Sequence, residues 1–357
     1  MEPHRTRRVI VFGGYGTFGA HVASELARRN LTLTVAGRSR PKGEAAAARL
    51  GPPHRWVVAD VQDPASCRAA LDGHSVAIHC AGRFSPAHTT LLQACLDARC
   101  HYVDIADDRA YCAIVRGQGP RFAELGLTAA YGCSSLPSIS GAIAQTAAAG
   151  AAAALRRVRC TLFIGNRNPK GPAAVEAALE RLGRTIQAPQ GRLRALRDRE
   201  LVRLPPPFGA RVALNFESPD YDLLPKLLEV QSVSVKVAFE LPGSAALFAG
   251  LAAAAPRIGR RLVPWLVQLG SGVSRFGSSG GAVAAELWLA DGSMRRAAVV
   301  ALEHGQRMAA LPAVYVAEKL CLTAECPAGA LAGYELLGGP QLITKLVTDG
   351  YRRIRDW

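Results

Sequence analysis

A glycine-rich segment near the N-terminus has the residue types and the spacing of a phosphate-binding loop. Gly14, Gly16 and Gly19 fit the pattern GxGxxG and follow the apolar run Val9–Phe12. These glycines permit a tight turn, a close approach to a pyrophosphate, and packing of a helix whose positive end faces the phosphates. A glycine-rich turn of another α/β fold is the alternative. The predicted dinucleotide contacts are Gly14, Tyr15, Gly16, Thr17, Phe18 and Gly19.

The end of the second predicted strand carries basic residues where NAD-binding proteins usually carry an acid. That acid binds the 2′-hydroxyl of the ribose. Here the strand ends in Gly37-Arg38-Ser39-Arg40, without a carboxylate. Arg38 can form a charge-assisted bond with a 2′-phosphate, and Ser39 can donate a second hydrogen bond. The sequence therefore predicts NADP(H) as the cofactor, and a solvated basic turn is the alternative interpretation.

Two more strand ends are expected to contact the dinucleotide. Asp60 ends the third predicted strand, where an acid can reach the adenine amino group, and Val61 follows it. Asp60 could also serve as a cap before the next helix, and the two roles are compatible. The fourth strand ends in the small residues Cys80, Ala81 and Gly82, which leave room for the dinucleotide at the sheet edge.

The elements that must position these residues alternate between strand and helix. Apolar runs predict strands at residues 8–12, 31–36, 55–59, 76–80, 101–105 and 127–131. Helical patterns separate several of these runs, and this order is typical of a parallel sheet with helices on both faces. The sequence thus predicts an α/β protein whose residues 1–140 form a doubly wound Rossmann domain.

The remainder of the chain has a different pattern. Strands are expected at 158–164 and 232–240, a helix at 172–183, and a hairpin around Asp291-Gly292. This mixture predicts a second, α+β domain over residues 141–310 with a mixed or antiparallel sheet. The C-terminal residues 311–357 are expected to form helices that return to the Rossmann domain.

Candidates for catalysis follow from position, because ligands of such sheets bind outside the carboxyl ends of the strands. Tyr102 and Asp104, on the fifth strand, are the candidate proton donors for reduction of an imine or a carbonyl. Core packing for Tyr102 and a helix cap for Asp104 are the competing structural roles. His79 and His101 lie in or beside apolar strands and are interpreted as core residues.

Four polar residues are candidate substrate contacts for the same positional reason. Ser134 and Ser135 follow the sixth strand, and they could instead be turn formers. Arg167 and Lys170 follow the first strand of the second region, and either could hold a substrate carboxylate.

Other catalytic and metal-binding patterns find no support. The sequence contains no HExxH, no GxSxG and no Cys/His cluster with metal-ligand spacing. Tyr315 and Lys319 fit the Tyr-x-x-x-Lys spacing of short-chain dehydrogenases, but they lie far beyond the sixth strand, so the match is interpreted as chance.

The chain is strongly basic, with 43 Lys and Arg residues, 28 Asp and Glu residues, and a net charge of +15. A basic surface could bind nucleic acid, anionic lipid or an anionic substrate. The basic residues are spread along the chain rather than clustered, and aromatic residues make up only 6%. We therefore expect no nucleic-acid partner and attribute the charge to compositional bias and a phosphorylated cofactor.

The cysteines and the N-terminal residues indicate the cellular compartment of the protein. The nine cysteines are odd in number and include no CxxC pair, which is typical of a reducing compartment. No apolar leader precedes the first strand, so a cytoplasmic protein is expected.

Residues 241–270 combine apolar helices with an arginine cluster. Burial at a homodimer interface is the favoured interpretation, with an anionic membrane surface or the cover of an apolar pocket as alternatives.

Three features together resemble the saccharopine-dehydrogenase-like NADP-binding family. They are the glycine loop with Arg38-Ser39, the segment 80–84 followed by Ala94-Cys95, and the segment 101–106. The chain departs from the family in having Arg83 where proline is frequent and Asp107-Asp108 where one subgroup has Gly-Glu. The resemblance covers residues 8–140 well and continues more loosely beyond them.

The resemblance implies a two-domain NADP(H)-dependent oxidoreductase. The Rossmann part would bind the cofactor, and the α+β part would shape the pocket for a small-molecule substrate and the dimer contact. The expected reaction is hydride transfer to or from a C=N, C=O or C=C group. A non-catalytic NADP-binding regulator and a membrane-surface Rossmann protein are the alternatives.

Overall fold

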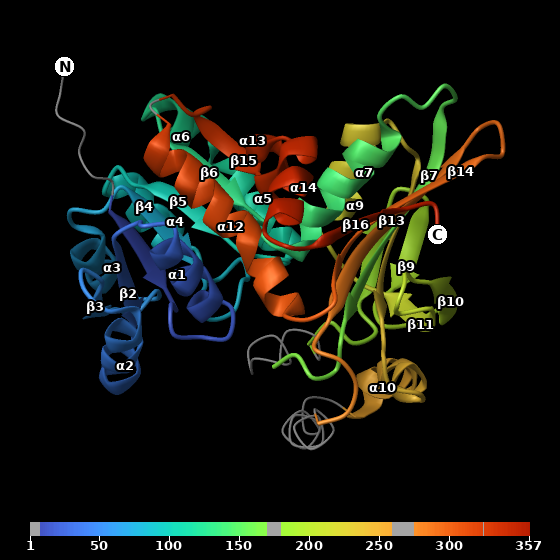
Figure 1. Cartoon of the computed structure of the whole chain (residues 1–357), viewed down its shortest axis with the longest axis horizontal. Coiled ribbons are helices and arrows are strands. Elements are labelled where there is room, and N and C mark those ends of the chain that lie inside the picture. The colour runs from blue at the N-terminus through green and yellow to red at the C-terminus, as the bar shows by residue number, and fades with distance from the viewer. Residues whose placement is uncertain (1–7, 170–179, 259–274, 324) are drawn as a thin grey trace. The chain divides into compact units, whose positions relative to one another are not determined.

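The computed structural model describes residues 8–169, 180–258, 275–323 and 325–357. The chain divides into two compact units, shown in Figure 1. The first unit comprises Met1–Ser134 and Ala309–Leu337, and the second comprises Ser135–Met308 and Gly338–Trp357. Each unit therefore contains a discontinuous part of the chain, and residues 338–357 pack with the second unit.

The first unit is built on a sheet of seven parallel strands in the order β15-β6-β5-β4-β1-β2-β3. Its strands are β1 (Val9–Phe12), β2 (Leu33–Gly37), β3 (Arg55–Val58), β4 (Val76–His79), β5 (His101–Asp104), β6 (Thr128–Tyr131) and β15 (Gly329–Ala332). The chain runs outward from β1 to β3 on one side and from β4 to β15 on the other. The strand order reverses between β1 and β4, which is where doubly wound sheets bind ligands. The predicted Rossmann fold is confirmed.

Helices connect these strands. They are α1 (Gly19–Arg28), α2 (Arg40–Leu50), α3 (Pro64–Leu71), α4 (Thr90–Asp97), α5 (Arg109–Gly117), α6 (Gly119–Glu124), the part of α12 (Gly305–Leu322) from Ala309 onward, and α13 (Gly333–Leu337). Asp63 caps α3 by accepting a hydrogen bond from the Ala65 N–H, with Pro64 in the first turn. Asp108 caps α5 in the same way through the Tyr111 N–H. The apolar pattern predicts no helix between β5 and β6, whereas the structure has α5 and α6 there.

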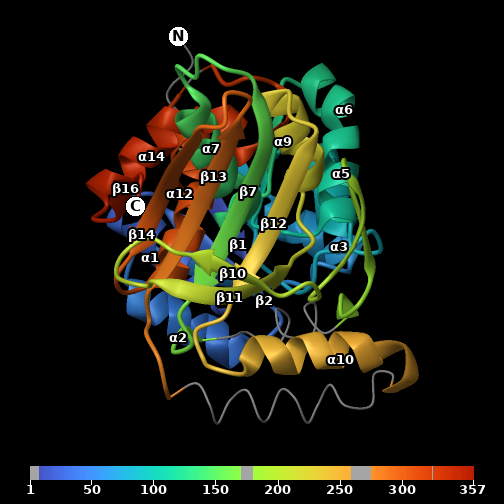
Figure 2. The same ribbon diagram turned by 90° about the vertical axis from the view of Figure 1, so that its right-hand side faces the viewer.

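The second unit contains a mixed sheet in the order β10-β11-β12-β7-β13-β14-β16 and a separate hairpin, β8-β9. Its strands are β7 (Leu155–Ile164), β8 (Thr185–Ala188), β9 (Gly191–Arg194), β10 (Glu200–Arg203), β11 (Ala210–Asn215), β12 (Ser232–Ala238), β13 (Gly281–Leu289), β14 (Met294–Ala301) and β16 (Arg352–Arg355). β12 and β7 pair in parallel, and the other pairs are antiparallel. Figure 2 shows β12, β7, β13 and β14 side by side. The second, mixed sheet and the hairpin around Asp291-Gly292 are as predicted.

Helices and a buried ionic cluster complete the second unit. The helices are η1 (Ser135–Ile139), α7 (Ser140–Ala148), α9 (Asp220–Leu228), α10 (Ser244–Ile258) and α14 (Gly339–Thr348). α7 packs on β13 and β14, and α9 packs on β12. Within the sheet, Arg159 forms ion pairs with the carboxylates of Glu286 and Glu200. The charges of Arg159 and Glu286 are buried and Glu200 is partly exposed, so each buried charge has an opposite charge beside it, as its desolvation requires.

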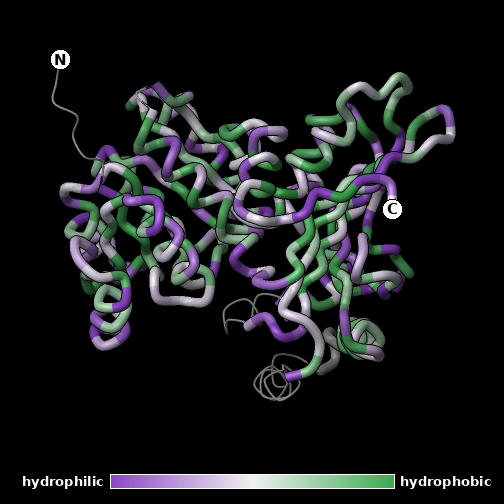
Figure 3. Tube along the Cα trace, viewed as in Figure 1, coloured by the Kyte–Doolittle hydropathy of each residue, from purple (hydrophilic) through white to green (hydrophobic). Residues whose placement is uncertain are grey.

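The burial pattern explains which strands are central. All residues of β1 and β4 are buried, and Figure 3 shows much of the inner trace of both units in hydrophobic green. β16, with the sequence RRIR, is mostly exposed at the edge of its sheet. Within the described ranges, no helix has the length and apolarity needed to cross a membrane. The predicted helix at 172–183 and the segment 241–270 lie partly outside the described residues, so their interpretation stays a prediction.

Candidate cofactor-binding and active site

The phosphate loop joins β1 to α1 through a tight, glycine-dependent turn. Gly13 adopts a positive φ of 76° and donates its N–H to the Ala36 carbonyl at 2.7 Å. A side chain on Gly13 would lie 2.8 Å from the Ala81 backbone. A Cβ on Gly19 would collide with the Gly13 carbonyl group, 2.7 Å from its carbon. The loop thus depends on glycine where α1 meets the end of β1.

Several N–H groups of this loop remain available to a ligand. The N–H groups of Gly14 and Gly16 bond within the loop, to the carbonyls of Val11 and Gly13. In the described part of the chain, no hydrogen bond engages the N–H groups of Tyr15, Thr17 and Phe18. These three precede the positive end of α1, so the loop has the donors that a pyrophosphate requires.

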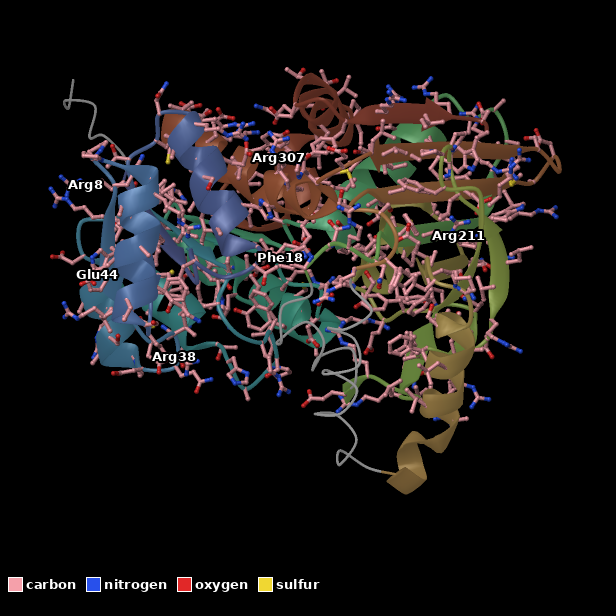
Figure 4. The ribbon with its side chains drawn as sticks, turned by 60° about the horizontal axis from the view of Figure 1, so that its bottom comes forward. Arg8, Phe18, Arg38, Glu44, Arg211 and Arg307 are labelled. Carbon is pink, nitrogen blue, oxygen red and sulfur yellow. The ribbon has the colours of Figure 1, made fainter. Side chains whose placement is uncertain are left out.

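The tip of β2 presents polar groups to solvent. Arg38 is exposed, and no ion pair or hydrogen bond engages its guanidinium within the described ranges. Ser39 is the N-cap residue of α2, yet its side chain makes no capping bond. Its N–H donates to the Tyr15 hydroxyl at 2.9 Å. The guanidinium of Arg40, by contrast, lies 5.1 Å from the centre of the Trp56 ring. Figure 4 labels Arg38 beyond the end of β2 and Phe18 at the start of α1.

The next two strand ends lie along the same carboxyl edge. The Asp60 carboxylate accepts a hydrogen bond from the Gln62 N–H at 3.0 Å, and Asp60 is partly exposed, like Val61. The bond is an Asx turn within the loop, and the cap of α3 is Asp63 rather than Asp60. After β4, Cys80 donates its N–H to the Phe12 carbonyl at 2.8 Å, which ties this segment to β1. Ala81 is partly exposed, and Gly82 is exposed with a φ of 71°.

A buried chain of hydrogen bonds connects this segment to β5 and α5. His79 Nε2 bonds to the Ala81 carbonyl at 2.9 Å, and His79 Nδ1 lies 3.0 Å from the Tyr102 hydroxyl. The Tyr102 hydroxyl also bonds to the Tyr111 hydroxyl at 2.6 Å. A carbonyl only accepts, so Nε2 carries the imidazole proton and Nδ1 accepts from Tyr102. Tyr102 in turn accepts from Tyr111.

Burial sets the charge state of this chain. Desolvation lowers the pKa of His79 to about 4, so the ring is neutral at pH 7. Burial also raises the pKa of the Tyr102 hydroxyl well above its ordinary value. The Phe84 ring packs on His79 with 4.8 Å between ring centres. These contacts fix the segment that follows β4 to β5 and α5.

Asp104 is fully buried at the end of β5. Its Oδ1 accepts hydrogen bonds from the Gly132 N–H at 2.8 Å and the Ala106 N–H at 3.0 Å. Its Oδ2 is buried without a hydrogen-bond partner in the described residues. Burial raises the pKa of Asp104 to about 6, although the two N–H groups oppose this shift. The carboxyl group is therefore protonated in part of the molecules near neutral pH.

The candidate substrate residues are not brought into one cluster by any recorded contact. Ser134 is partly exposed in the first unit, and Ser135 begins η1 in the second. Arg167 is exposed after β7, and its N–H donates to the Ser278 carbonyl at 2.9 Å. Lys170 lies outside the described residues. Their substrate roles stay predictions.

Sequence reasoning missed part of this site. His79 was interpreted as a core residue, which matches its burial, but its bond to the Ala81 carbonyl was not foreseen. Tyr111 received no role because α5 was not predicted. The signal that could have found it is Asp108, three residues before Tyr111, which is the spacing of an N-cap. No group of His, Cys, Asp and Glu side chains among the described residues could hold a metal ion.

Comparisons with known proteins agree with this geometry. The profile of the family described as "Saccharopine dehydrogenase NADP binding domain" matches residues 9–130. No curated protein sequence matches the chain. Among solved structures, apo histidine-tagged saccharopine dehydrogenase (L-Glu forming) from Saccharomyces cerevisiae has a TM-score of 0.65 at 12% identity. The match covers 98% of this chain and 100% of that one, and at this identity it shows a shared fold.

Shorter matches cover one part of the chain. A short-chain type dehydrogenase/reductase from Mycobacterium ulcerans has a TM-score of 0.31 at 15% identity, covering 35% of this chain and 66% of its own. The family profile, the glycine loop and the parallel sheet together show that residues 9–130 are similar to the saccharopine dehydrogenase NADP-binding domain.

Proposed function

We propose that this protein is an NADP(H)-dependent oxidoreductase. It would transfer a hydride to or from a C=N, C=O or C=C group of a small substrate. The hydride chemistry belongs to the cofactor, and the protein supplies binding, orientation and a proton source. The family of residues 9–130 supports the cofactor class, and the finer assignments rest on the following contacts.

The exposed, unengaged guanidinium of Arg38 carries the choice of NADP(H) over NAD(H). It follows Gly37 at the tip of β2, where a carboxylate would bind the ribose diol of NAD. Arg38 can meet a 2′-phosphate with two parallel hydrogen bonds. Arg40 is a weaker candidate, since its guanidinium lies over Trp56 and 3.8 Å from the Glu44 carboxylate.

Asp104 is the preferred proton donor of the two candidates. A general acid works best when its pKa lies near the working pH, and the pKa of Asp104 is about 6. Its Oδ2 is buried and has no hydrogen-bond partner in the described part of the chain, so it could give a proton to a substrate group that reaches this buried position. The Tyr102 hydroxyl is engaged by both His79 and Tyr111. Tyr102 is thus better suited to holding the site than to releasing a proton.

Other assignments from the sequence stay part of the proposal. An exposed guanidinium such as that of Arg167 is suited to a substrate carboxylate, and Ser134 and Ser135 can donate hydrogen bonds. A homodimer is expected from the family resemblance.

The first experiment measures binding of NADPH and NADH by calorimetric titration. The wild-type protein should bind NADPH more tightly than NADH. Arg38→Ala should weaken NADPH binding about 10- to 100-fold and NADH binding less than about threefold, because hydrogen bonds to charged groups are worth about 1.5–3 kcal/mol. Arg49→Ala is the matched control, since Arg49 is an exposed arginine in the last turn of α2.

Two results would contradict the proposal. Equal loss of NADPH and NADH binding in Arg38→Ala would remove the cofactor choice. Absence of binding to both dinucleotides at millimolar concentration would remove the cofactor altogether. Absorbance at 340 nm during incubation of NADPH with imines, carbonyls and activated alkenes then tests the reaction, and tight binding without turnover would favour the regulatory alternative.

A further inference from the structure

The glycine that ends β2 is not required by its own backbone. Gly37 has no positive φ, so an L-amino acid could adopt its conformation. A Cβ on Gly37 would nevertheless lie 2.6 Å from Cε1 and Cζ of the Tyr15 ring, and closer still to its hydroxyl oxygen. The ring of Tyr15 therefore fills the space that a side chain at position 37 would need.

This occupied space bears on cofactor choice. In NAD-binding Rossmann domains, a carboxylate at the end of the second strand bonds to the ribose diol. Position 37 is the last residue of β2. A carboxylate there would require the far end of the Tyr15 side chain to move. Tyr15 thus disfavours the side chain that would repel a 2′-phosphate.

The Tyr15 hydroxyl is also oriented by the tip of β2. It accepts a hydrogen bond from the Ser39 N–H at 2.9 Å, across 24 residues of sequence. A phenol that accepts one bond still has its own proton to donate. In the described part of the chain, no group accepts this proton. Tyr15 is only partly buried, so its hydroxyl can donate this proton to a ligand that approaches from the solvent.

Three donor-bearing residues are therefore available at the tip of β2. The Tyr15 hydroxyl is joined to the Ser39 N–H by a hydrogen bond, the Ser39 hydroxyl makes no capping bond, and the exposed Arg38 precedes Ser39 in the chain. A phosphate dianion accepts hydrogen bonds on three oxygens, whereas a ribose hydroxyl offers one. The set complements a monoester phosphate better than a diol.

We propose that Tyr15 is a specificity-determining residue, which donates its hydroxyl proton to the 2′-phosphate of NADP(H) and keeps position 37 free of a side chain. This inference rests on the proposed function and adds a role for a residue outside the tip of β2. The hydroxyl of Tyr15 would bind the phosphate and the ring would fill the space at position 37, and these two roles can be tested separately.

The hydroxyl is tested with Tyr15→Phe, which keeps the ring. Calorimetric titration should show NADPH binding weakened about tenfold and NADH binding changed less than about twofold. Adenosine 2′,5′-bisphosphate should lose affinity in the same proportion, while adenosine 5′-monophosphate should not. The matched control is Tyr351→Phe in the second unit, whose hydroxyl accepts a hydrogen bond from Arg307 at 3.1 Å.

The ring is tested by placing a carboxylate at position 37. Gly37→Asp alone should lose NADPH binding without gaining affinity for NADH, because Tyr15 blocks the carboxylate. Gly37→Asp combined with Tyr15→Ala should bind NADH at least about fivefold more tightly than Gly37→Asp alone. Circular dichroism spectra and melting temperatures of all variants establish that the loop variants are folded.

The outcomes separate this inference from the proposed function. A wild-type protein that binds neither dinucleotide ends both. A wild-type protein that prefers NADPH, with the preference intact in Tyr15→Phe, ends the role of the hydroxyl alone. Equal NADH affinity of the single and double variants at position 37 ends the steric role of the ring.

Discussion

The tip of β2 and the carboxyl ends of β4 and β5 belong to the same sheet but use polar groups in opposite ways. At the tip of β2, the guanidinium of Arg38 is exposed and unengaged within the described residues. At the ends of β4 and β5, the hydroxyl of Tyr102 and the imidazole of His79 are buried and bonded to each other. Asp104 is buried as well, with one oxygen bonded twice and the other unpartnered.

Under the proposed function, cofactor recognition belongs to the exposed groups and the reaction to the buried ones along the same sheet edge. The binding role of a solvated donor can be predicted from its residue type alone. Buried groups acquire new properties, because desolvation moves a pKa by an amount that depends on every neighbour. Cofactor choice is therefore expected to respond to single charges at the tip of β2. The reaction is expected to respond to the packing around Asp104.

The largest effect is expected from a substitution that distorts the phosphate loop, because cofactor binding at both regions depends on this loop. In Gly19→Val, the new side chain would collide with the Gly13 carbonyl and push α1 away from β1. NADPH and NADH should both lose more than about 100-fold in affinity, since a misplaced helix start removes phosphate contacts worth several kcal/mol. Titration with both dinucleotides measures this loss. Gly117→Ala is the control, because no atom lies within 4 Å of the added methyl group. Retained NADPH affinity in Gly19→Val would mean that the loop does not bind the phosphates.

The next effect concerns the charge of Asp104. Its pKa is raised in the folded protein to about 6 from an ordinary value of 3.8, so the folded state binds the proton more tightly than the unfolded state. The stability due to this proton is fully present below about pH 3 and is lost as the pH rises through 6. Asp104→Asn cannot ionise. Its free energy of unfolding relative to wild type should therefore rise by about 3 kcal/mol between pH 3 and pH 8.

Urea denaturation at several pH values measures this difference. Asp72→Asn is the control, since Asp72 is exposed and its carboxylate is solvated in both states. A difference between Asp104→Asn and wild type that does not vary with pH would show that burial does not perturb this carboxyl group. The ends of β4 and β5 would then not differ from the tip of β2 in the way burial affects a charged group.

The smallest effect is expected from the outer end of the buried hydrogen-bond chain. Tyr111→Phe removes the hydroxyl that donates to Tyr102 and leaves the ring beside Phe84. The free energy of unfolding should fall by about 1 kcal/mol, the usual net value of one hydrogen bond. NADPH affinity should change less than about twofold, because His79 still holds the Ala81 carbonyl. A large loss of NADPH affinity with unchanged stability would instead place Tyr111 in the binding site.

Much of the cofactor end could be predicted from the sequence. The glycine spacing and the absence of an acid after β2 involve residues close together in the chain, and each has a meaning that follows from backbone geometry or charge. The apolar runs likewise predicted the first six parallel strands. The α5 helix was missed, since its buried face contains Tyr111 and Cys112 beside Val115 rather than a run of aliphatic residues.

The reactive end could be predicted only as a set of positions. Asp104 and Tyr102 were expected at the end of β5, and both lie there. Their surroundings come from elsewhere: His79 is 23 residues from Tyr102, and Gly132 is 28 residues from Asp104. Hydrogen bonds over such separations depend on strand order and register, which no local pattern encodes.

The sequence by itself determined a parallel sheet, a glycine-rich loop after β1 and a cationic residue at the tip of β2, since these depend on short-range geometry and on charge. Only the tertiary structure decided that Tyr15 covers Gly37, that His79 is neutral with its proton on Nε2, and that Asp104 keeps its proton near pH 6. The physical reason is that contact, tautomer and pKa are set by neighbours and by the exclusion of water, and folding alone assembles both.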